Sequence, residues 1–232
     1  MKYFKLVLTI TVIITVIYLG RGYIFSFIVS KSLDINCSID SVSINPFSGL
    51  ISAEKITIKN PPGYHNHNAI KIANVSYHLD FYKLITGEVI ISEINLSGVN
   101  LFFENRARTS NISEILTNIK NASRSDKESK SAVVIDKLNI VNSQVILTSQ
   151  LNNSLTFDIP DIHKTDFITK NQNKSITEAT FGVISSFATI AVKVASNSNT
   201  FEIGGLMNDL YNIGIDLSSF SLNVFNNTAK LL

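Results

Sequence analysis

The 232-residue sequence lacks the residues that several kinds of site require. A single cysteine, Cys37, excludes an internal disulfide and a cysteine-rich zinc site, and we expect it to be a small buried hydrophobe. Charged residues make up 16% of the chain, against about 25% in an average soluble domain. Twenty Lys and Arg residues nearly balance eighteen Asp and Glu residues. Because nucleic-acid-binding proteins usually carry a strong basic excess, this balance argues against nucleic acid as a partner.

Motifs of catalysis and cofactor binding are also missing. The sequence has no G-x-S-x-G, H-E-x-x-H, phosphate-binding loop or G-x-G-x-x-G. Ser52 and Lys55 match the S-x-x-K of serine acyl enzymes, but they fall in a predicted strand and the partner motifs are absent. His65 and His67 could contact a metal, yet the next acid along the chain is Asp80, so a solvated loop is the simpler interpretation. We expect no catalytic residues, no metal, no cofactor and no enzymatic activity.

An uncharged, strongly apolar stretch lies near the N-terminus, from Leu6 to Leu19, after two lysines. A helix from Leu6 to Ile28 would be about 34 Å long, enough to cross a hydrocarbon core of ~30 Å. We therefore predict a membrane-spanning helix. A cleaved signal peptide is the alternative, although Gly20-Arg21-Gly22 is a poor cleavage site. In both interpretations the rest of the chain is exported, if the basic residues before the apolar stretch stay in the cytoplasm.

From Ser30 onwards the sequence alternates between apolar and polar residues, which is the pattern of β-strands. Turns rich in Pro, Gly and Asn separate these segments, for example at Ser97-Gly98. Consecutive strands on short links favour an antiparallel meander. We predict strands at 35–44, 50–59, 70–79, 88–96, 99–104, 133–140, 144–149 and 155–159.

An internal repeat relates residues 89–103 to residues 133–147 at a constant offset of 44 residues. Its kernel, apolar-x-x-apolar-x-apolar, occurs five times, beginning at Ile39, Ala53, Ile72, Ile91 and Ile135. The two-residue step in the kernel breaks the alternation, and a β-bulge or bend would restore one apolar face. Because repeated bends curve a sheet, we expect a curved sheet with an apolar concave face.

Two helices are predicted to interrupt the strands. Asn111 and Glu114 have the spacing of a capping box and predict a helix over 111–121, with a polar, flexible loop over 120–131. Ser175 and Glu178 predict a second helix, apolar on nearly all sides, which packs over the sheet or lies at a membrane interface.

The predicted fold class is mainly β (α+β), in three parts. Residues 1–30 form the N-terminal membrane helix or signal peptide. Residues 31–165 form the curved antiparallel sheet with its first helix and loop. Residues 166–232 form the C-terminal helix and a tail.

Several segments, taken in order, carry a family resemblance. After the basic start and apolar helix come Ile44–Gly49 (INPFSG), Lys59–Tyr64 (KNPPGY), Leu79–Glu88 (LDFYKLITGE), Phe157–Ile162 (FDIPDI) and Ser175–Ala179 (SITEA). Together they resemble the AsmA-like proteins of bacterial envelopes, which are related to larger proteins with chorein-like lipid grooves. The resemblance covers about residues 1–180, and the tail after Ser196 has no clear match.

The resemblance implies a single-pass protein of the bacterial inner membrane, with its N-terminus in the cytoplasm and most of the chain in the periplasm. It implies a role in envelope lipid homeostasis or outer-membrane assembly. The expected partners are the inner membrane, phospholipid and other envelope proteins. The family carries no catalytic residues that could be transferred to this chain.

Two functions remain open. In the first, the concave face binds or handles lipid, because burying each acyl methylene contributes about 0.8 kcal/mol. In the alternative, the protein is a non-catalytic structural or protein-interaction module with a closed core and no ligand. The residues that would face lipid in the first case, and form an ordinary core in the second, are Ile56, Ile58, Ile91, Ile94, Leu96, Leu101, Phe103, Leu138 and Ile140.

Overall fold

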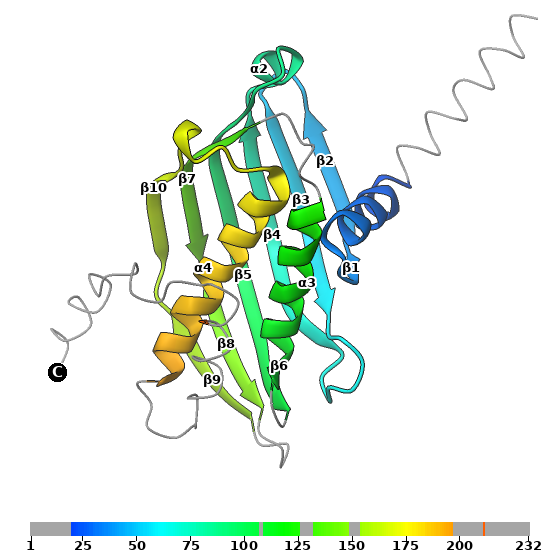
Figure 1. Ribbon diagram of the computed structural model, residues 1–232, viewed down its shortest axis with the longest axis vertical. Helices are drawn as coiled ribbons and strands as arrows, with labels where there is room; N and C mark the ends of the chain where they lie inside the picture. The colour runs from blue at the N-terminus through cyan, green and yellow to red at the C-terminus, as the bar shows by residue number, and fades with distance from the viewer. Residues whose placement is uncertain (1–19, 107–108, 126–131, 149–153, 197–210, 212–232) are drawn as a thin grey trace, which may run out of the picture.

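The computed structural model describes residues 20–106, 109–125, 132–148, 154–196 and 211. They form one open, mixed β-sheet with helices across one of its faces (Figure 1). Its strands are β1 (Cys37–Ser38), β2 (Ser41–Asn45), β3 (Leu50–Lys59), β4 (Asn68–Leu79), β5 (Val89–Arg106), β6 (Thr109–Ser110), β7 (Val133–Val141), β8 (Ser143–Thr148), β9 (Ser154–Ile159) and β10 (Ile162–Ile168). Its helices are α2 (Phe81–Ile85), α3 (Asn111–Ser125), α4 (Ile176–Ser196), a 3₁₀ turn (Lys170–Gln172) and an N-terminal helix over residues 20–33.

The predicted mainly β fold is confirmed, but the antiparallel meander is wrong at the centre of the sheet. The strand order is β1-β3-β4-β5-β7-β10, and β5 runs parallel to both β7 and β8. The physical reason is α3, which carries the chain back across the face of the sheet after β5. The strand that follows α3 therefore enters in the same direction as β5. β10, which the sequence pattern did not predict, closes this side against β7.

The internal repeat corresponds to the parallel pairing. Val89 lies opposite Val133, Leu96 opposite Ile140 and Phe103 opposite Leu147, each pair separated by the same 44 residues. The two copies of the repeat therefore lie side by side and in register. As a result, apolar positions of β5 meet apolar positions of β7 and β8 along the contact, except that Ser97 lies opposite Val141.

The predicted turn at Ser97-Gly98 is a bend inside one strand. β5 continues through it for 18 residues, and Gly98 has a positive φ of 67°. Because of this bend, Leu96 and Val99 on either side of it both face the core. The two-residue step at Ser97-Gly98 therefore keeps the apolar side chains on one face of the sheet. A bulge was predicted to have the same effect in the kernels.

Similar irregularities cross the sheet. The registers place Lys55 opposite Ala73, Ala73 opposite Gly98, and Gly98 opposite Asn142. Lys55 and Asn142 have positive φ values of 50° and 53°, like Gly98. Two further register shifts lie opposite kernels. The shift between His78 and Leu79 in β4 lies opposite the kernel that begins at Ile91. The shift between Thr165 and Ile168 in β10 lies opposite the kernel that begins at Ile135. The predicted bends are thus confirmed at these kernels.

The core lies between the apolar face of the sheet and the two long helices. In α3 the apolar stripe of Ile112, Ile115, Leu116 and Ile119, with the i, i+3, i+4, i+7 spacing of one helix face, is buried. α4 contributes a closely packed surface of mostly small residues, among them Ala188 and Ala191 at 0% exposure. The prediction that this second helix packs over the sheet is therefore confirmed.

The opposite face of the sheet is polar. Rows of Ser, Asn, Thr and Lys side chains cross it in register, and neighbouring strands exchange side-chain hydrogen bonds. Asn139 Nδ2 donates to Asn95 Oδ1 at 2.8 Å, and Nδ1 of the His163 ring lies 2.9 Å from Asn139 Oδ1. The sheet is therefore amphipathic, with one covered apolar face and one polar face.

The helix ends correct two expectations and confirm one. Ser110, not Asn111, caps α3: its Oγ accepts the Ser113 N–H at 3.1 Å, and the Ser113 Oγ accepts the Ser110 N–H. α3 extends to Ser125, so the predicted loop is helical over its first part, and residues 126–131 lie outside the described residues. The Ser175–Glu178 box at α4 is confirmed, with both reciprocal bonds present.

The N-terminal helix covers the free edge of β1. Ser30 Oγ accepts the Cys37 N–H at 2.9 Å, and Ser26 Oγ accepts the Ile39 N–H at 2.7 Å. One turn earlier, a β-carbon at Gly22 would meet the backbone oxygens of Ile39 and Asp40 at 2.8 and 2.7 Å. Cys37 is buried as expected, and this burial raises the pKa of its thiol to about 11.

Most of the predicted membrane helix, residues 6–19, lies outside the described residues. Within the part of the chain that is described, no helix has the length and apolar character needed to cross a bilayer.

The bend at Gly98 can be tested by substitution. A β-carbon at Gly98 would lie 2.8 Å from the Ala73 β-carbon, and the positive φ disfavours any side chain. We expect Gly98→Ala to lower the free energy of unfolding by about 2 kcal/mol, measured by urea unfolding.

Two further variants separate the causes. Gly87 also has a positive φ but no neighbour within 4 Å, so Gly87→Ala reports the backbone strain alone. Adding Ala73→Gly to Gly98→Ala should recover part of the loss. A Gly98→Ala variant no less stable than Gly87→Ala would contradict the close contact.

Candidate functional site on the apolar face and at the two ends of the sheet

The nine residues predicted to face lipid lie together on the apolar face of the sheet. The register joins them across strands: Ile94 lies opposite Leu138, and Leu96 opposite Ile140. Two of them, Ile56 and Ile91, are partly buried against the core. The seven that are no more than 8% exposed are Ile58, Ile94, Leu96, Leu101, Phe103, Leu138 and Ile140. In this conformation these seven form a core with α3 and α4, and contact with lipid stays a prediction.

A partly exposed continuation of this face leads towards α2. The helices above the sheet make most of their contacts with β5 to β9, so the ends of β3 and β4 near α2 are less covered. A phenol is uncharged at neutral pH, and burial raises the pKa of the Tyr77 hydroxyl there further, to about 12. We call this continuation the apolar strip; its half-buried residues are Ile51, Ile56, Ile72, Tyr77, Leu79 and Ile91.

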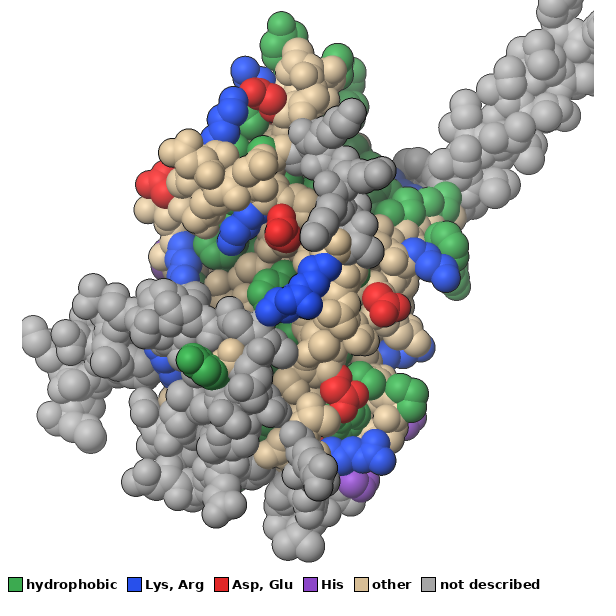
Figure 2. All heavy atoms as spheres, in the orientation of Figure 1, with side chains coloured by type: hydrophobic (Ala, Val, Ile, Leu, Met, Phe, Trp, Pro, Cys, Tyr) green, Lys and Arg blue, Asp and Glu red, His purple; other side chains and the backbone are tan. Residues whose placement is uncertain are grey.

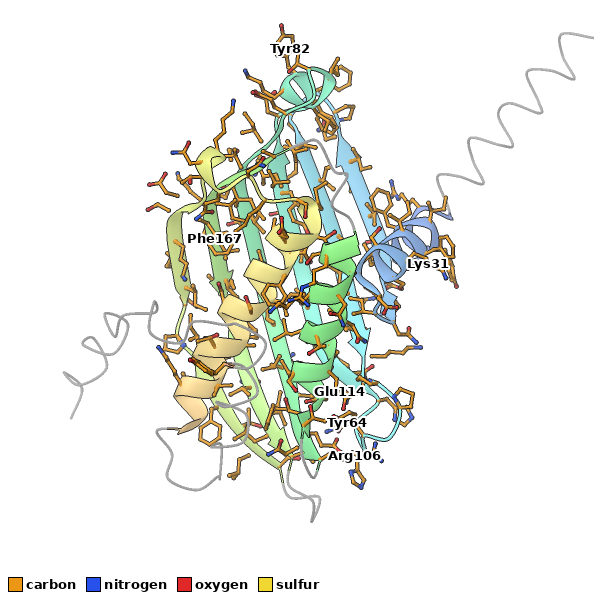
Figure 3. All side chains as sticks on the ribbon, viewed as in Figure 1. Lys31, Tyr64, Tyr82, Arg106, Glu114 and Phe167 are labelled. Carbon is orange, nitrogen blue, oxygen red and sulfur yellow. The ribbon has the colours of Figure 1, made fainter. Side chains whose placement is uncertain are left out.

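Beyond the strip, the sheet ends in an exposed apolar tip, which we define as the turn Pro46–Gly49 together with α2. Phe47 is 100% exposed, Ile85 86% and Tyr82 75%. The two segments adjoin because the Leu79 N–H donates to the Gly49 carbonyl at 2.8 Å. Figure 3 shows Tyr82 projecting from the upper end of the molecule. The sequence pattern did not predict α2, because five residues are too few to show a helical period.

The other end of the sheet carries a polar network centred on Glu104, which is 5% exposed. Its carboxylate accepts the backbone N–H groups of His65 and Asn66 at 2.8 and 3.1 Å. Burial alone would raise the Glu104 pKa, but the two backbone hydrogen bonds and the His65 ring outweigh it and hold that pKa below its usual value. This carboxylate therefore fixes the loop between β3 and β4 onto the end of β5.

Neighbouring groups complete the network at this end. Asn111 accepts the Glu104 N–H at 3.0 Å and donates to Asn60 and to the Phe102 carbonyl. Tyr64 donates from its hydroxyl to Glu114 Oε1 at 2.6 Å, and Figure 3 shows the two beside Arg106. Asn111 was predicted to cap α3; instead, it joins the helix to the strand and the loop.

His65 and His67 lie in an exposed loop, as expected, but a distant acid also holds this loop in place. Nδ1 of His65 lies 2.7 Å from Glu104 Oε1, and Glu104 comes from a strand 39 residues further along the chain. The nearest acid in sequence was therefore not the nearest in space. Among the described residues, no group of three or more His, Cys, Asp or Glu side chains could hold a metal ion.

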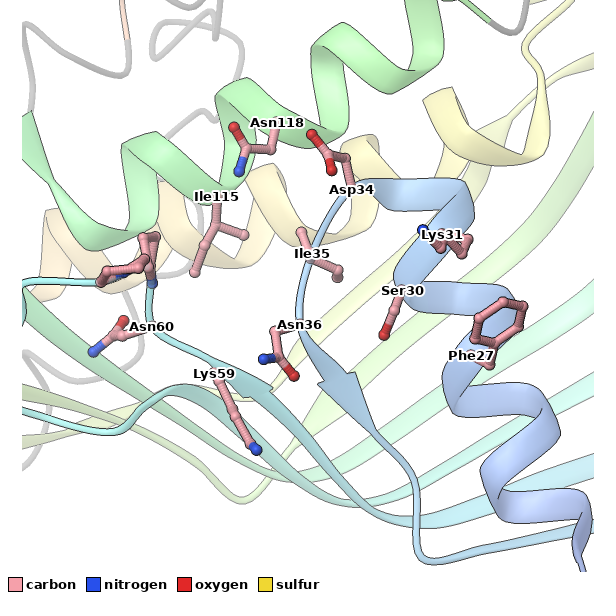
Figure 4. Close-up of a pocket in the computed structure, with 12 residues that line it drawn as sticks. Phe27, Ser30, Lys31, Asp34, Ile35, Asn36, Lys59, Asn60, Ile115 and Asn118 are labelled. Atoms are coloured by element: carbon pink, nitrogen blue, oxygen red, sulfur yellow. The ribbon is translucent and has the colours of Figure 1, made fainter.

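An open cleft of about 540 Å³ lies between the N-terminal helix, the loop after β3 and α3 (Figure 4). Its lining mixes apolar residues such as Phe27 and Ile115 with Lys31, Lys59 and Asn118. In Figure 4 the two lysines point to different sides and do not converge on one position. The cleft therefore lacks the convergent polar groups that mark a specific ligand site.

Comparison with known protein families gives a match. The model of the AsmA family matches residues 28–200, which spans the sheet and α4. Comparison with curated proteins and with solved structures gives no match.

The Glu104 network generates a pH-dependent prediction. Because the pKa of Glu104 is lowered in the folded protein, its stabilising effect is present above the unfolded-state pKa of about 4.3 and is lost as the pH falls through the folded-state value. We expect Glu104→Gln to lower the free energy of unfolding by about 1–3 kcal/mol at pH 7.

This difference from the wild type should shrink as the pH falls below about 4, because the wild-type carboxylate is then protonated too. Urea unfolding at a series of pH values measures it. Glu54→Gln, at an exposed carboxylate, serves as the control. A Glu104→Gln deficit that is independent of pH would show that the charge is not what stabilises the loop.

Proposed function

The chain belongs to the AsmA family, a family of the bacterial envelope, and on this basis we propose that it is a membrane-anchored, non-catalytic module that handles lipid. In this proposal the N-terminal helix holds the protein in the inner membrane, with the N-terminus in the cytoplasm. The sheet lies in the periplasm and contributes to envelope lipid homeostasis or outer-membrane assembly.

The observation that carries the proposal is the apolar strip. It continues the apolar face past the two long helices and ends at the exposed tip. A single acyl chain lying along Ile56 and Ile91 would remove its methylenes from water, and each contributes about 0.8 kcal/mol. Tyr77 is the ionisable residue among the six that define the strip, and its phenol, whose pKa is raised, adds no charge at neutral pH. These features suit an acyl chain better than a polar ligand.

The covered part of the same face sets a limit on how lipid could be held. Leu101 and Leu138 are at most 1% exposed, so no acyl chain fits against them while α3 and α4 are in place. Lipid would therefore contact the strip, with its headgroup towards the α2 end of the sheet. The protein would hold one lipid at a time rather than a continuous row.

Seven of the nine residues that were predicted to face lipid are buried in the core, and this favours the second candidate function. In that case the protein is a closed structural or protein-interaction module of the envelope, with no ligand. The polar face and the Glu104 end would then contact other envelope proteins.

The proposed absence of catalysis rests on how the polar groups are used. Both oxygens of Glu104, the most buried carboxylate described, accept hydrogen bonds from the adjoining loop. The histidine rings with hydrogen-bond partners among the described residues, those of His65 and His163, contact Glu104 and Asn139. Neither contacts a hydroxyl or a thiol, which a nucleophile activated by histidine would require.

Native mass spectrometry of the full chain, purified from bacterial membranes in mild detergent, distinguishes the two functions. We expect phospholipid at a defined stoichiometry. The double variant Ile56→Ser, Ile91→Ser should lower its occupancy about tenfold, because both side chains lie on the strip.

Ile146→Ser is the matched control, since Ile146 is also half-buried but belongs to the polar face beside Phe102. Ile94 and Leu101 are unsuitable probes, because polar groups at such buried positions would unfold the domain. A folded wild-type protein that carries no lipid would reject lipid handling and leave the closed module. Equal loss of lipid in the control would also contradict a site on the strip.

A further inference from the structure

We propose that the tip is a second membrane contact, which docks on the surface of the lipid bilayer and places the apolar strip next to it. This inference rests on the proposed membrane anchoring and extends it. The anchor alone would tether the sheet, whereas docking of the tip fixes which end of the sheet faces the lipid.

The first observation is the concentration of exposed apolar side chains at this end. Phe47, Tyr82 and Ile85 are at least 75% exposed, and no residue of α2 is buried. Ile44 and Leu84, each more than 40% exposed, adjoin them. Figure 2 shows hydrophobic side chains gathered at the upper end of the molecule and along the N-terminal helix. Exposed clusters of large apolar residues mark interaction sites, and Tyr favours the membrane interface.

The second observation is the direction of the N-terminal helix. Ser30 contacts Cys37, Ser26 contacts Ile39, and Gly22 approaches Asp40. Moving towards the N-terminus of the helix therefore means moving along the edge strand towards β2 and its turn at Phe47. The apolar sequence from Leu6 to Leu19 thus precedes the helix at the end that faces the tip. Under the proposed anchoring, the membrane would lie on the side of the tip.

The third observation is the charge around the tip. Lys83 and Lys170 lie 3.5 and 2.8 Å from the same carboxylate, Glu88. Asp80, which caps α2 by accepting the Lys83 N–H, is a second acid here, so two acids balance two lysines beside the exposed aromatics. No net negative charge at the tip therefore repels an anionic bilayer surface.

The shape of the tip also favours a bilayer over a protein partner. Phe47 and Tyr82 project from a turn and a single short helix and are 100% and 75% exposed, so the surface that they form is convex. A protein partner would need a matching pocket, whereas the headgroup region of a bilayer adapts to any protruding apolar group.

The experiment uses the absence of tryptophan from the sequence. Phe47→Trp and Ile85→Trp each introduce a single fluorophore at an exposed position where it cannot disturb the core. The control is His67→Trp, in the exposed loop at the opposite end of the sheet. Each full-length variant is reconstituted into vesicles of phosphatidylcholine and phosphatidylglycerol, with and without brominated acyl chains.

We expect brominated lipid to quench the fluorescence of the Phe47→Trp and Ile85→Trp variants about twofold or more over the His67→Trp control, with a matching loss of quenching by aqueous acrylamide. Variants that stay in the vesicles after a high-salt wash, but whose tip and control probes are equally accessible to acrylamide, would overturn the docked tip and leave the anchor intact. Protein that is washed off the vesicles would instead reject the proposed membrane anchoring and, with it, the docked tip.

Discussion

The structure depends on keeping one face of long strands apolar despite a sequence whose alternation is repeatedly interrupted. Because side chains alternate along a strand, a step of one extra residue moves every later apolar side chain to the polar face. The left-handed residues Lys55 in β3, Gly98 in β5 and Asn142 between β7 and β8 lie in one row across the sheet, with Ala73 of β4 between the first two, and absorb this step together. The apolar face therefore stays continuous through 18 residues of β5, and the helices have a surface to cover.

The edge of the sheet is protected by a match between two periodicities. Serines four residues apart on a helix are separated by about 6 Å along its axis, and strand N–H groups two residues apart by about 6.6 Å. Ser26 and Ser30 can therefore accept the N–H groups of Ile39 and Cys37, as a neighbouring strand would. This pairing covers an edge that could otherwise join another sheet, and it fixes the direction of the helix relative to the strands.

Short-range patterns were sufficient to predict most elements of the fold but not the places where distant segments meet. The stripe of α3, the cap of α4 and the bends in the kernels follow from local spacing, and all are confirmed. The parallel pairing was missed because short links were taken as hairpins, although the constant offset of the repeat already indicated neighbours in register. The contact of His65 with Glu104 was missed because it joins residues 39 apart in sequence, which no local pattern encodes.

The two ends of the sheet differ in chemistry, and this difference constrains how the molecule can act. At one end, Glu104 and Asn111 use their hydrogen-bonding capacity to hold a loop, which leaves that end rigid and polar. At the other end, the exposed groups are Phe47, Tyr82 and Ile85, which water solvates poorly. Only this second end gains free energy by leaving water, and it is also the end where the apolar face is least covered. A lipid that enters or leaves the apolar face therefore has its shortest path through the tip, so membrane attachment and lipid handling would depend on the same end of the sheet.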